Sequence, residues 1–116
     1  MTVSVFIIAE AGVNHCGDLE KAMEMIEVAA RSGADAIKFQ TFKAIELTTS
    51  DAPKARYQAD FTGEESSQQS MLAELELSDE AHRALFEHCR VNGIEFMSTG
   101  FDADSVDLLI ALDTKR

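Results

Sequence analysis

Three polar side chains stand in or beside stretches that otherwise have the composition of buried strands. Glu10 follows directly after the apolar run 5–9, and Lys38 and Gln40 lie inside the run 35–41. An α/β architecture gathers its ligand-binding groups at the carboxyl ends of its strands, so Glu10 is a candidate general acid or base. The alternative for Glu10 is an exposed acid at a strand end, or a partner that caps a helix.

Lys38 is the more informative residue, because parallel strands are normally buried on both faces. Burying an unpaired ammonium is costly, so Lys38 needs an anionic partner such as a ligand phosphate or a neighbouring acid. Gln40 lies two residues on and shares the face of Lys38, whereas Ile37 and Phe39 face the helices. A cation and an amide would then line one interior surface. A salt bridge from Lys38 to Glu10, made only for stability, is the alternative.

A third strand also ends in polar groups. Ser98 and Thr99 close the run 94–98, and Asp102 stands where the next helix should start. Hydroxyl groups and backbone N–H groups at a helix N-terminus suit phosphate or carboxylate. Asp102 is equally well suited to act only as the N-cap of that helix.

The histidines and cysteines offer less. His15 lies in the first loop, where it is either a hydrogen-bonded structural group or a functional one. His82 and His88 lie six residues apart, which does not match metal-ligand spacing on a helix, so we expect both to be solvated. Cys16 and Cys89 form no C-x-x-C pair and are expected to be reduced thiols. No complete metal site and no nucleotide-binding fingerprint is visible.

The elements that position these residues alternate between strand and helix. Apolar positions at i, i+3, i+4 spacing follow Asp18, a helix cap, and Gly33 is a helix stop. From residue 42 to about 66 the periodicity is lost, which predicts an irregular excursion with a short helix at most. We expect strands over 5–9, 35–41 and 94–98, and helices over 18–33, 70–77, 79–92 and from Ala103 onward.

This alternation predicts an α/β fold with a parallel sheet covered by helices. A (β/α)₈ barrel needs about 250 residues and eight strands, so the chain could supply only a partial TIM barrel. It would consist of the first three β/α units with an irregular insertion after the second strand. A complete small doubly wound domain is the competing architecture. Residues 1–116 are taken as one domain, the N-terminal portion of such a barrel.

Composition limits the partners. The chain has 116 residues, with 10 basic and 21 acidic side chains and a formal net charge of -11. This charge repels nucleic acid and anionic membranes, so neither is expected as a partner. No window approaches the roughly 18 to 20 apolar residues of a membrane helix, and the N-terminus lacks the features of a secretion signal. We therefore expect a cytoplasmic protein.

Four blocks of sequence carry a resemblance to a known family. They are IAEAGVNH at 8–15, GADAIKFQT at 33–41, DAPKARYQ at 51–58 and FMSTGFD at 96–102. Together and in this order they resemble the sialic-acid-synthase (NeuB) family, and the block at 51–58 is especially similar to bacterial sialic and diacetyllegionaminic acid synthases. The resemblance covers residues 5 to about 112. Family members are longer barrels followed by a small antifreeze-like domain.

The resemblance implies a reaction. Phosphoenolpyruvate attacks the open-chain aldehyde of an N-acylated amino sugar through its C3, water adds at C2, and phosphate leaves by C–O cleavage. It implies that Glu10 handles proton transfer or orients the water, and that Lys38 and Thr99 hold phosphoenolpyruvate. The remaining implied residues are Gln40, Phe101 and Asp102 in the same pocket and Asn14 and His15 as loop contacts.

The resemblance also implies partners that this sequence does not supply. A divalent metal, Mn or Mg, would be held by histidines beyond Arg116, and the full-length enzyme would be a homo-oligomer, a dimer. The isolated chain is then expected to be inactive. The alternative is a free-standing truncated relative that acts as a non-catalytic binding or interaction module. Two positions depart from the family pattern: Gly100 replaces a proline, and Cys16 replaces asparagine or glutamate.

Overall fold

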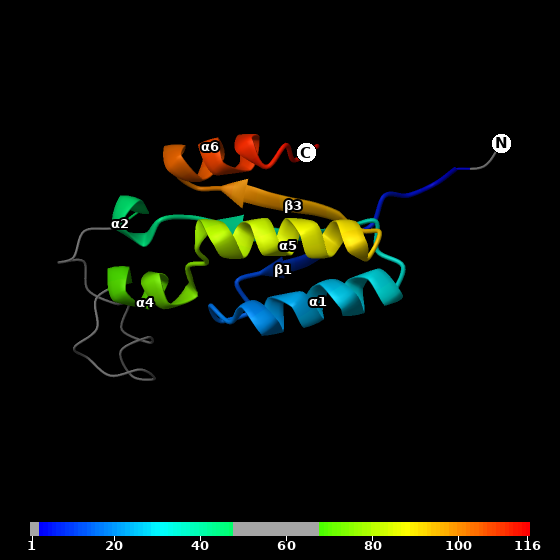
Figure 1. Ribbon diagram of the computed structural model, residues 1–116, viewed down its shortest axis with the longest axis horizontal. Coiled ribbons are helices and arrows are strands. Elements are labelled where there is room, and N and C mark those ends of the chain that lie inside the picture. Colours follow the sequence, from blue (N-terminus) through cyan, green and yellow to red (C-terminus); the bar gives the residue numbers. More distant parts are fainter. Residues whose placement is uncertain (1–2, 48–67) are drawn as a thin grey trace.

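A computed structural model describes residues 3–47 and 68–116. Strands and helices alternate, as predicted, and all three strands belong to one sheet (Figure 1). In chain order the elements are β1 (Ile8–Gly12), α1 (Leu19–Arg31), β2 (Ala36–Thr41), α2 (Ala44–Leu47), α4 (Gln68–Leu75), α5 (Asp79–Val91), β3 (Glu95–Gly100) and α6 (Ala103–Ala111).

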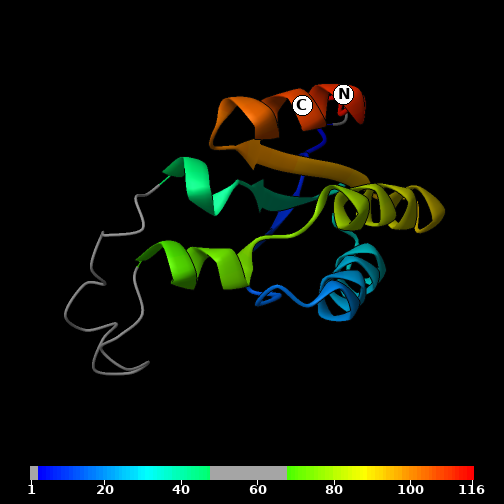
Figure 2. The ribbon, with the colours of Figure 1, turned by 60° about the vertical axis from the view of Figure 1, so that its left-hand side comes forward.

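The sheet is parallel and has the order β1-β2-β3. Each strand is followed by a helix, which gives three β/α units in sequence order. Helices α1 and α5 contact each other, and α6 contacts β3; Figures 1 and 2 show these helices running alongside the strands. The prediction of an α/β fold with a parallel sheet is confirmed.

Helix α1 illustrates how local chemistry sets the boundaries of an element. Asp18 has an extended backbone, and its carboxylate accepts hydrogen bonds from the N–H groups of Glu20 and Lys21. This satisfies two of the N–H groups that a helix start leaves unpaired. At the other end Gly33 adopts a φ of 89°, a left-handed conformation that glycine adopts without steric cost. Both predicted ends of the helix are confirmed.

The core lies between the sheet and the helices α1 and α5. Phe39 of β2 is fully buried, and its ring lies 5.7 Å from that of Phe96 in β3. Ile26 of α1 and Leu85 of α5 are also fully buried. Each such side chain stabilises the fold by about 1.5–3 kcal/mol relative to exposure. This packing holds the strands rigidly and leaves the opposite face of the sheet for polar groups.

Two strand predictions need correction. The first strand spans Ile8–Gly12 rather than 5–9, so Glu10 lies within β1 and not after it. The apolar residues at 5–7 precede the strand and are exposed. The third strand runs to Gly100, which pairs in register with Thr41, so Thr99 and Gly100 lie in the strand and not in a turn.

The excursion after β2 contains a short helix, as predicted. Helix α2 has only four residues, Ala44–Leu47, and the N–H of Ala44 donates to the carboxylate of Glu76 after α4. Residues 48–67 lie outside the described part of the chain, and the block at 51–58 lies among them. Helix α4 begins at Gln68 and ends at Leu75, two residues earlier at each end than predicted.

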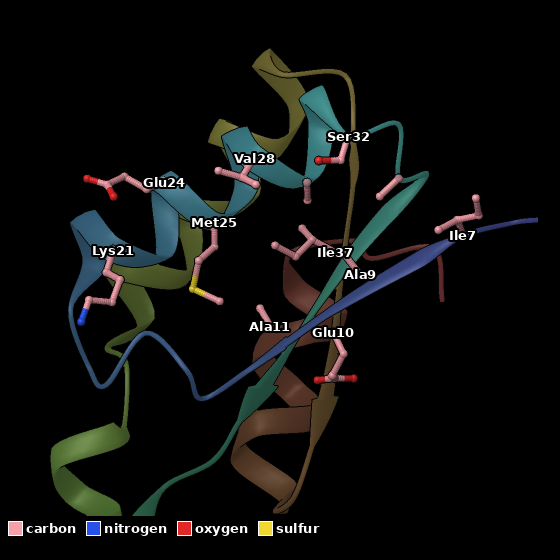
Figure 3. A pocket seen from close by; sticks show the side chains of 12 residues that line it. Ile7, Ala9, Glu10, Ala11, Lys21, Glu24, Met25, Val28, Ser32 and Ile37 are labelled. Atoms are coloured by element: carbon pink, nitrogen blue, oxygen red, sulfur yellow. The ribbon is translucent and has the colours of Figure 1, made fainter.

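An apolar groove runs between α1 and the outer edge of β1. Within the described residues β1 pairs only with β2, so its other edge has no strand beside it. The groove has a volume of about 530 Å³, and Met25 and Val28 of α1 face Ala9 and Ala11 of β1 across it (Figure 3). None of the described helices combines the length and the apolar composition needed to cross a membrane.

Candidate functional site

Glu10 and Lys38 face each other across the first two strands. They are register partners in the parallel ladder, and their side chains form an ion pair with an Nζ–Oε2 distance of 3.4 Å. In Figure 3 the carboxylate of Glu10 points away from α1, so Glu10 and its partner Lys38 lie on the sheet face opposite α1, the inner face. The side chains of Lys38 and Glu10 are 36% and 53% exposed, so a ligand can reach both.

The salt bridge that the sequence offered as the alternative for Lys38 is therefore present. A partly exposed ion pair of this kind contributes only about 0–1 kcal/mol to stability. Stability alone is a weak reason to place a lysine inside a parallel strand. Lys38 can therefore still be either a ligand-binding residue or a residue paired only for stability. The two opposite charges of the pair are accessible on an open surface.

Gly12 keeps space free between the polar side chains. The ladder shifts register between Glu10 and Gly12, where β1 has one more residue than β2. A Cβ atom on Gly12 would lie 3.4 Å from Oε1 of Glu10 and 3.7 Å from Nε2 of Gln40. The φ of Gly12 is 55°, which disfavours any other residue. A Cβ at this position would be in van der Waals contact with both the Glu10 carboxylate and the Gln40 amide, so the bulge places Gly12 beside both groups.

Thr99 extends this arrangement to the third strand. It is the register partner of Gln40 and is exposed, so the two side chains share the inner face. Ser98 does not belong to the site, because its hydroxyl lies 2.6 Å from that of Thr41 on the helix side of the sheet. Four predicted residues are thus collected on one surface: Glu10, Lys38, Gln40 and Thr99.

Asp102 is the N-cap of α6. Its carboxylate accepts hydrogen bonds from the N–H and the hydroxyl of Ser105 and from the N–H of Lys43. Burial acts to raise the pKa of Asp102, but these three hydrogen bonds hold it below its usual value. The capping role that the sequence left open is observed. The same bonds fasten the loop after β2 to the first turn of α6.

Phe101 and Asn14 lie beside the inner face but are not grouped with Glu10, Lys38, Gln40 and Thr99. Phe101 is 48% exposed and lines a cavity of about 220 Å³ together with Gln40 and Phe42. Its N–H donates to the carbonyl of Thr41. Asn14 is exposed in the loop between β1 and α1. Both residues lie near the carboxyl ends of the strands, where ligand contacts of an α/β fold collect.

His15 is buried within the loop between β1 and α1, so its side chain is not exposed to solvent. The N–H of Gly17 donates to its Nδ1, so in the neutral ring Nε2 carries the proton. Nε2 is buried and has no hydrogen-bond partner among the described residues. Burial lowers the pKa of His15, and the nearby His82 lowers it further. Of the two roles that the sequence left open for His15, the bond from Gly17 accounts for the structural one, and contact with a ligand stays a prediction.

The expectation that His82 and His88 are solvated is wrong for His82 and holds only in part for His88. His82 is 1% exposed and lies between Thr41 and the Ser78 carbonyl, with Nε2 2.9 Å from the Thr41 hydroxyl. His88 is half-buried, and its Nε2 lies 2.9 Å from the carboxylate of Glu27. The sequence did hold a signal, because residues 82, 85 and 89 follow i, i+3, i+7 spacing and share the buried face of α5.

The cysteines are separate free thiols. Cys16 is exposed and has a φ of 55°, a left-handed conformation that is uncommon for residues other than glycine. Cys89 is buried, and desolvation raises its pKa to about 12, which keeps it protonated and unreactive. Within residues 3–47 and 68–116 no group of three His, Cys, Asp or Glu side chains is arranged to hold a metal ion. The described residues therefore do not fit the divalent metal that the resemblance implies.

Comparison with known proteins identifies relatives for this arrangement. The model of the NeuB family matches residues 25–116. The chain is 55% identical over 115 residues to an N,N'-diacetyllegionaminic acid synthase of Legionella pneumophila and 51% identical over 109 residues to one of Campylobacter jejuni. These alignments cover 99% and 94% of this chain but 32% and 33% of the relatives. The chain thus spans about a third of the length of these curated relatives.

A solved structure extends the comparison to the fold. It is the N-acetylneuraminic acid (sialic acid) synthetase of Leptospira borgpetersenii, crystallised in complex with citrate. The two chains superpose with a TM-score of 0.73 at 30% sequence identity, over 97% of this chain and 35% of the synthetase. The α/β arrangement of three parallel strands and their helices is therefore similar to part of a sialic acid synthase.

Proposed function

Because the chain belongs to the NeuB family, we propose that it is the N-terminal portion of a synthase that condenses phosphoenolpyruvate with an N-acylated amino sugar, such as N-acetylmannosamine, and releases phosphate. The product is a sialic-type, nonulosonic acid. The observation that carries this proposal is the grouping of Glu10, Lys38, Gln40 and Thr99 on one open face at the carboxyl ends of three parallel strands.

The proposed roles follow from the chemistry of the substrates. Phosphoenolpyruvate carries a phosphate and a carboxylate, and Lys38 supplies the positive charge that either group requires. Its ion pair with Glu10 is partly exposed and weak, so a multiply charged anion can displace the carboxylate from the ammonium. The Thr99 hydroxyl and the Gln40 amide add neutral donors on the same face.

Glu10 is the group we assign to proton transfer. When phosphoenolpyruvate pairs with Lys38 in place of Glu10, the Glu10 carboxylate remains beside Gly12, which carries no side chain. A water molecule that adds at C2 must lose a proton, and a carboxylate within hydrogen-bond reach can orient that water or accept the proton. The side chain of Glu10 is 53% exposed, which gives it access to such a water.

Further parts of the proposal concern what surrounds this chain in the complete protein. We assign residues 1–116 to the first three units of a (β/α)₈ barrel. The strandless outer edge of β1 and the apolar groove beside it favour further barrel elements there. The Mn or Mg ion is assigned to residues of the complete protein beyond Arg116, and no step above depends on it. The full-length enzyme is proposed to be cytoplasmic and homodimeric.

The test is an assay of the full gene product. Phosphate release from phosphoenolpyruvate is measured with a panel of N-acylated amino sugars. Lys38→Met should raise the KM for phosphoenolpyruvate roughly 10- to 150-fold, because it removes a charge-assisted hydrogen bond worth about 1.5–3 kcal/mol. Lys21→Met is the matched control, since Lys21 is an exposed lysine on α1, away from the inner face.

Two outcomes would count against the proposal. An unchanged KM in Lys38→Met would remove Lys38 from the substrate site while leaving the reaction itself standing. A native gene product with an intact mass near 12.7 kDa and no phosphate release with any acceptor would replace the synthase by the non-catalytic binding module.

A further inference from the structure

We propose that His82 is a positioning residue for this site, which acts through Thr41 and Ser98 to fix the strand ends that carry Gln40 and Thr99. The inference rests on the proposed function. It concerns a buried polar cluster on the helix side of the sheet, formed by His82, Thr41 and Ser98, that the roles above do not use.

The direction of every hydrogen bond in the cluster is determined. The Ser78 carbonyl can only accept, so Nδ1 of His82 donates to it over 2.9 Å. In the neutral ring Nε2 must then accept, and the Thr41 hydroxyl, 2.9 Å away, donates to it. The Thr41 oxygen is left as an acceptor, so the hydroxyl of Ser98, at 2.6 Å, donates to Thr41. The hydrogen bonds therefore run in one direction, from Ser98 in β3 through Thr41 in β2 to His82 in α5.

Burial fixes the donor and acceptor roles in these hydrogen bonds. His82 and Thr41 are each 1% exposed, so water does not offer either group an alternative partner. Desolvation lowers the pKa of His82, against the opposing effect of its bond to Ser78, which keeps the ring neutral and the direction of the bonds fixed. A cluster of this kind specifies one geometry, because any shift leaves a buried donor or acceptor unpaired.

The cluster of His82, Thr41 and Ser98 lies on the opposite face of the sheet from Gln40 and Thr99, at the same strand ends. Thr41 follows Gln40 and Ser98 precedes Thr99 in the chain, and Gln40 and Thr99 are register partners. Because strand side chains alternate, holding the hydroxyls on the helix side sets the direction of the amide and hydroxyl on the inner face. Packing of Phe39 and Phe96 against the helices holds the middle of the strands, but it does not determine the rotation of their last residues.

The first turn of α5 provides a fixed support for the chain of bonds. Ser78 is the N-cap of α5, and its hydroxyl accepts from the N–H of Ala81, so the carbonyl that receives the His82 proton belongs to an anchored residue. The Lys43 ammonium donates to Asp79 in the same turn over 2.8 Å. Two side chains thus connect the end of β2 to the start of α5.

A pair of substitutions at His82 separates positioning from general packing. In His82→Gln the terminal amide occupies the place of Nε2 and its oxygen can still accept from Thr41. In His82→Asn the amide occupies the place of Nδ1 and can still donate to Ser78, but the Thr41 bond is lost. Both variants lose the ring. With the full gene product, we expect kcat/KM for phosphoenolpyruvate to fall roughly 10-fold further in His82→Asn than in His82→Gln.

Thr41 provides an independent pair. Thr41→Val keeps the shape and removes the hydroxyl, whereas Thr41→Ser keeps the hydroxyl and should restore kcat/KM to within roughly 2-fold of wild type. Cys89→Ala is the control for stability alone, because Cys89 is buried on the same face of α5, seven residues from His82, and far from the strand ends that carry the site. It should lower the melting temperature and leave kcat and KM unchanged.

A spectroscopic readout reports on the cluster itself. Nitrogen-15 NMR of the imidazoles should show His82 protonated at Nδ1, the less common tautomer of a free histidine, and the Nε2 resonance should move in Thr41→Val but not in Thr41→Ser. The proposal is overturned if Thr41→Val and His82→Asn melt at lower temperature with wild-type kcat and KM, or if His82 carries its proton on Nε2. A wild-type protein that releases no phosphate would instead refute the proposed function, and the NMR result would still decide the cluster.

Discussion

Replacing Gly17 by alanine tests the closest approach between two parts of the chain that are distant in sequence. Gly17 lies in the loop between β1 and α1 and has a φ of 77°. A Cβ atom there would lie 2.1 Å from the carbonyl oxygen of Glu74, in α4. The loop that carries Asn14 and His15 can therefore lie against α4 only because this residue has no side chain.

The cost of Gly17→Ala has two parts. The left-handed backbone costs any residue with a Cβ about 1–2 kcal/mol. Carbon and oxygen rarely approach within 3.0 Å, so the Glu74 carbonyl, a backbone group, must retreat by about 0.9 Å. Overpacking of this size typically costs about 1–3 kcal/mol. We expect a total loss of about 2–5 kcal/mol.

Gly33→Ala and Gly93→Ala are matched controls for this experiment. Both glycines have positive φ values, 89° and 71°, but a Cβ on either would meet nothing within 4 Å. They should lose only the backbone part, about 1–2 kcal/mol. Urea unfolding of the full gene product measures the totals, and amide exchange across α4 locates the loss.

The difference between the variants decides the outcome. Faster exchange in α4 should occur in Gly17→Ala and not in the two controls. If Gly17→Ala costs no more than Gly33→Ala and leaves exchange in α4 unchanged, the loop and α4 do not touch at Glu74, and the argument from close approach fails.

Two further predictions concern pH and the end of β3. Because the pKa values of His15 and His82 are both lowered from 6.5 in the folded state, the unfolded chain binds more protons below that pH. The contribution of these two histidines to the free energy of unfolding should be fully present above about pH 6.5 and should fall on acidification by up to about 1.4 kcal/mol per pH unit for each histidine. Urea unfolding midpoints measured across pH 5–8 test this. His82→Gln should make the free energy of unfolding depend less on pH. Gly100→Ala should destabilise the protein by about 1–3 kcal/mol, because its Cβ would lie 2.9 Å from Cγ2 and 3.1 Å from the backbone N of Val106. The double variant with Val106→Ala should recover part of this loss in thermal unfolding, and strictly additive losses would contradict the contact.

Sequence reasoning succeeded where the physics is local. The cap at Asp18 and the stop at Gly33 depend on side-chain and backbone chemistry within one turn, and both ends of α1 were predicted correctly. The alternation around Lys38 likewise placed Phe39 in the core and Gln40 on the inner face, because a strand has a fixed period of two.

It failed where a partner distant in the chain decides the outcome. The apolar residues at 5–7 read as strand, but the ladder begins at Ile8, since pairing depends on where β2 lies and not on apolar composition. His82 was judged by metal-ligand spacing alone. Helical spacing places His82 on the buried face of α5, but its hydrogen bond to Thr41, 41 residues away, is specified by no local pattern.

The Glu10–Lys38 pair lies between these cases. The sequence predicted an anionic partner for Lys38 and named Glu10 as one candidate, and the structure brings the two together at 3.4 Å. The register shift after Glu10 was not predicted; the glycine at its end, Gly12, was assigned to the loop because the strand was expected to end before Glu10.

That extra residue in β1 has a consequence for how relatives of this protein can diverge. Ala11 is 2% exposed and fills a core position, while Gly12 turns toward the inner face. Deleting one residue between Glu10 and Gly12 would restore regular pairing, but it would take the methyl group of Ala11 out of the core and change the direction in which the following loop leaves the strand. A change in length at these three positions would therefore disturb the core and the exit of the loop together.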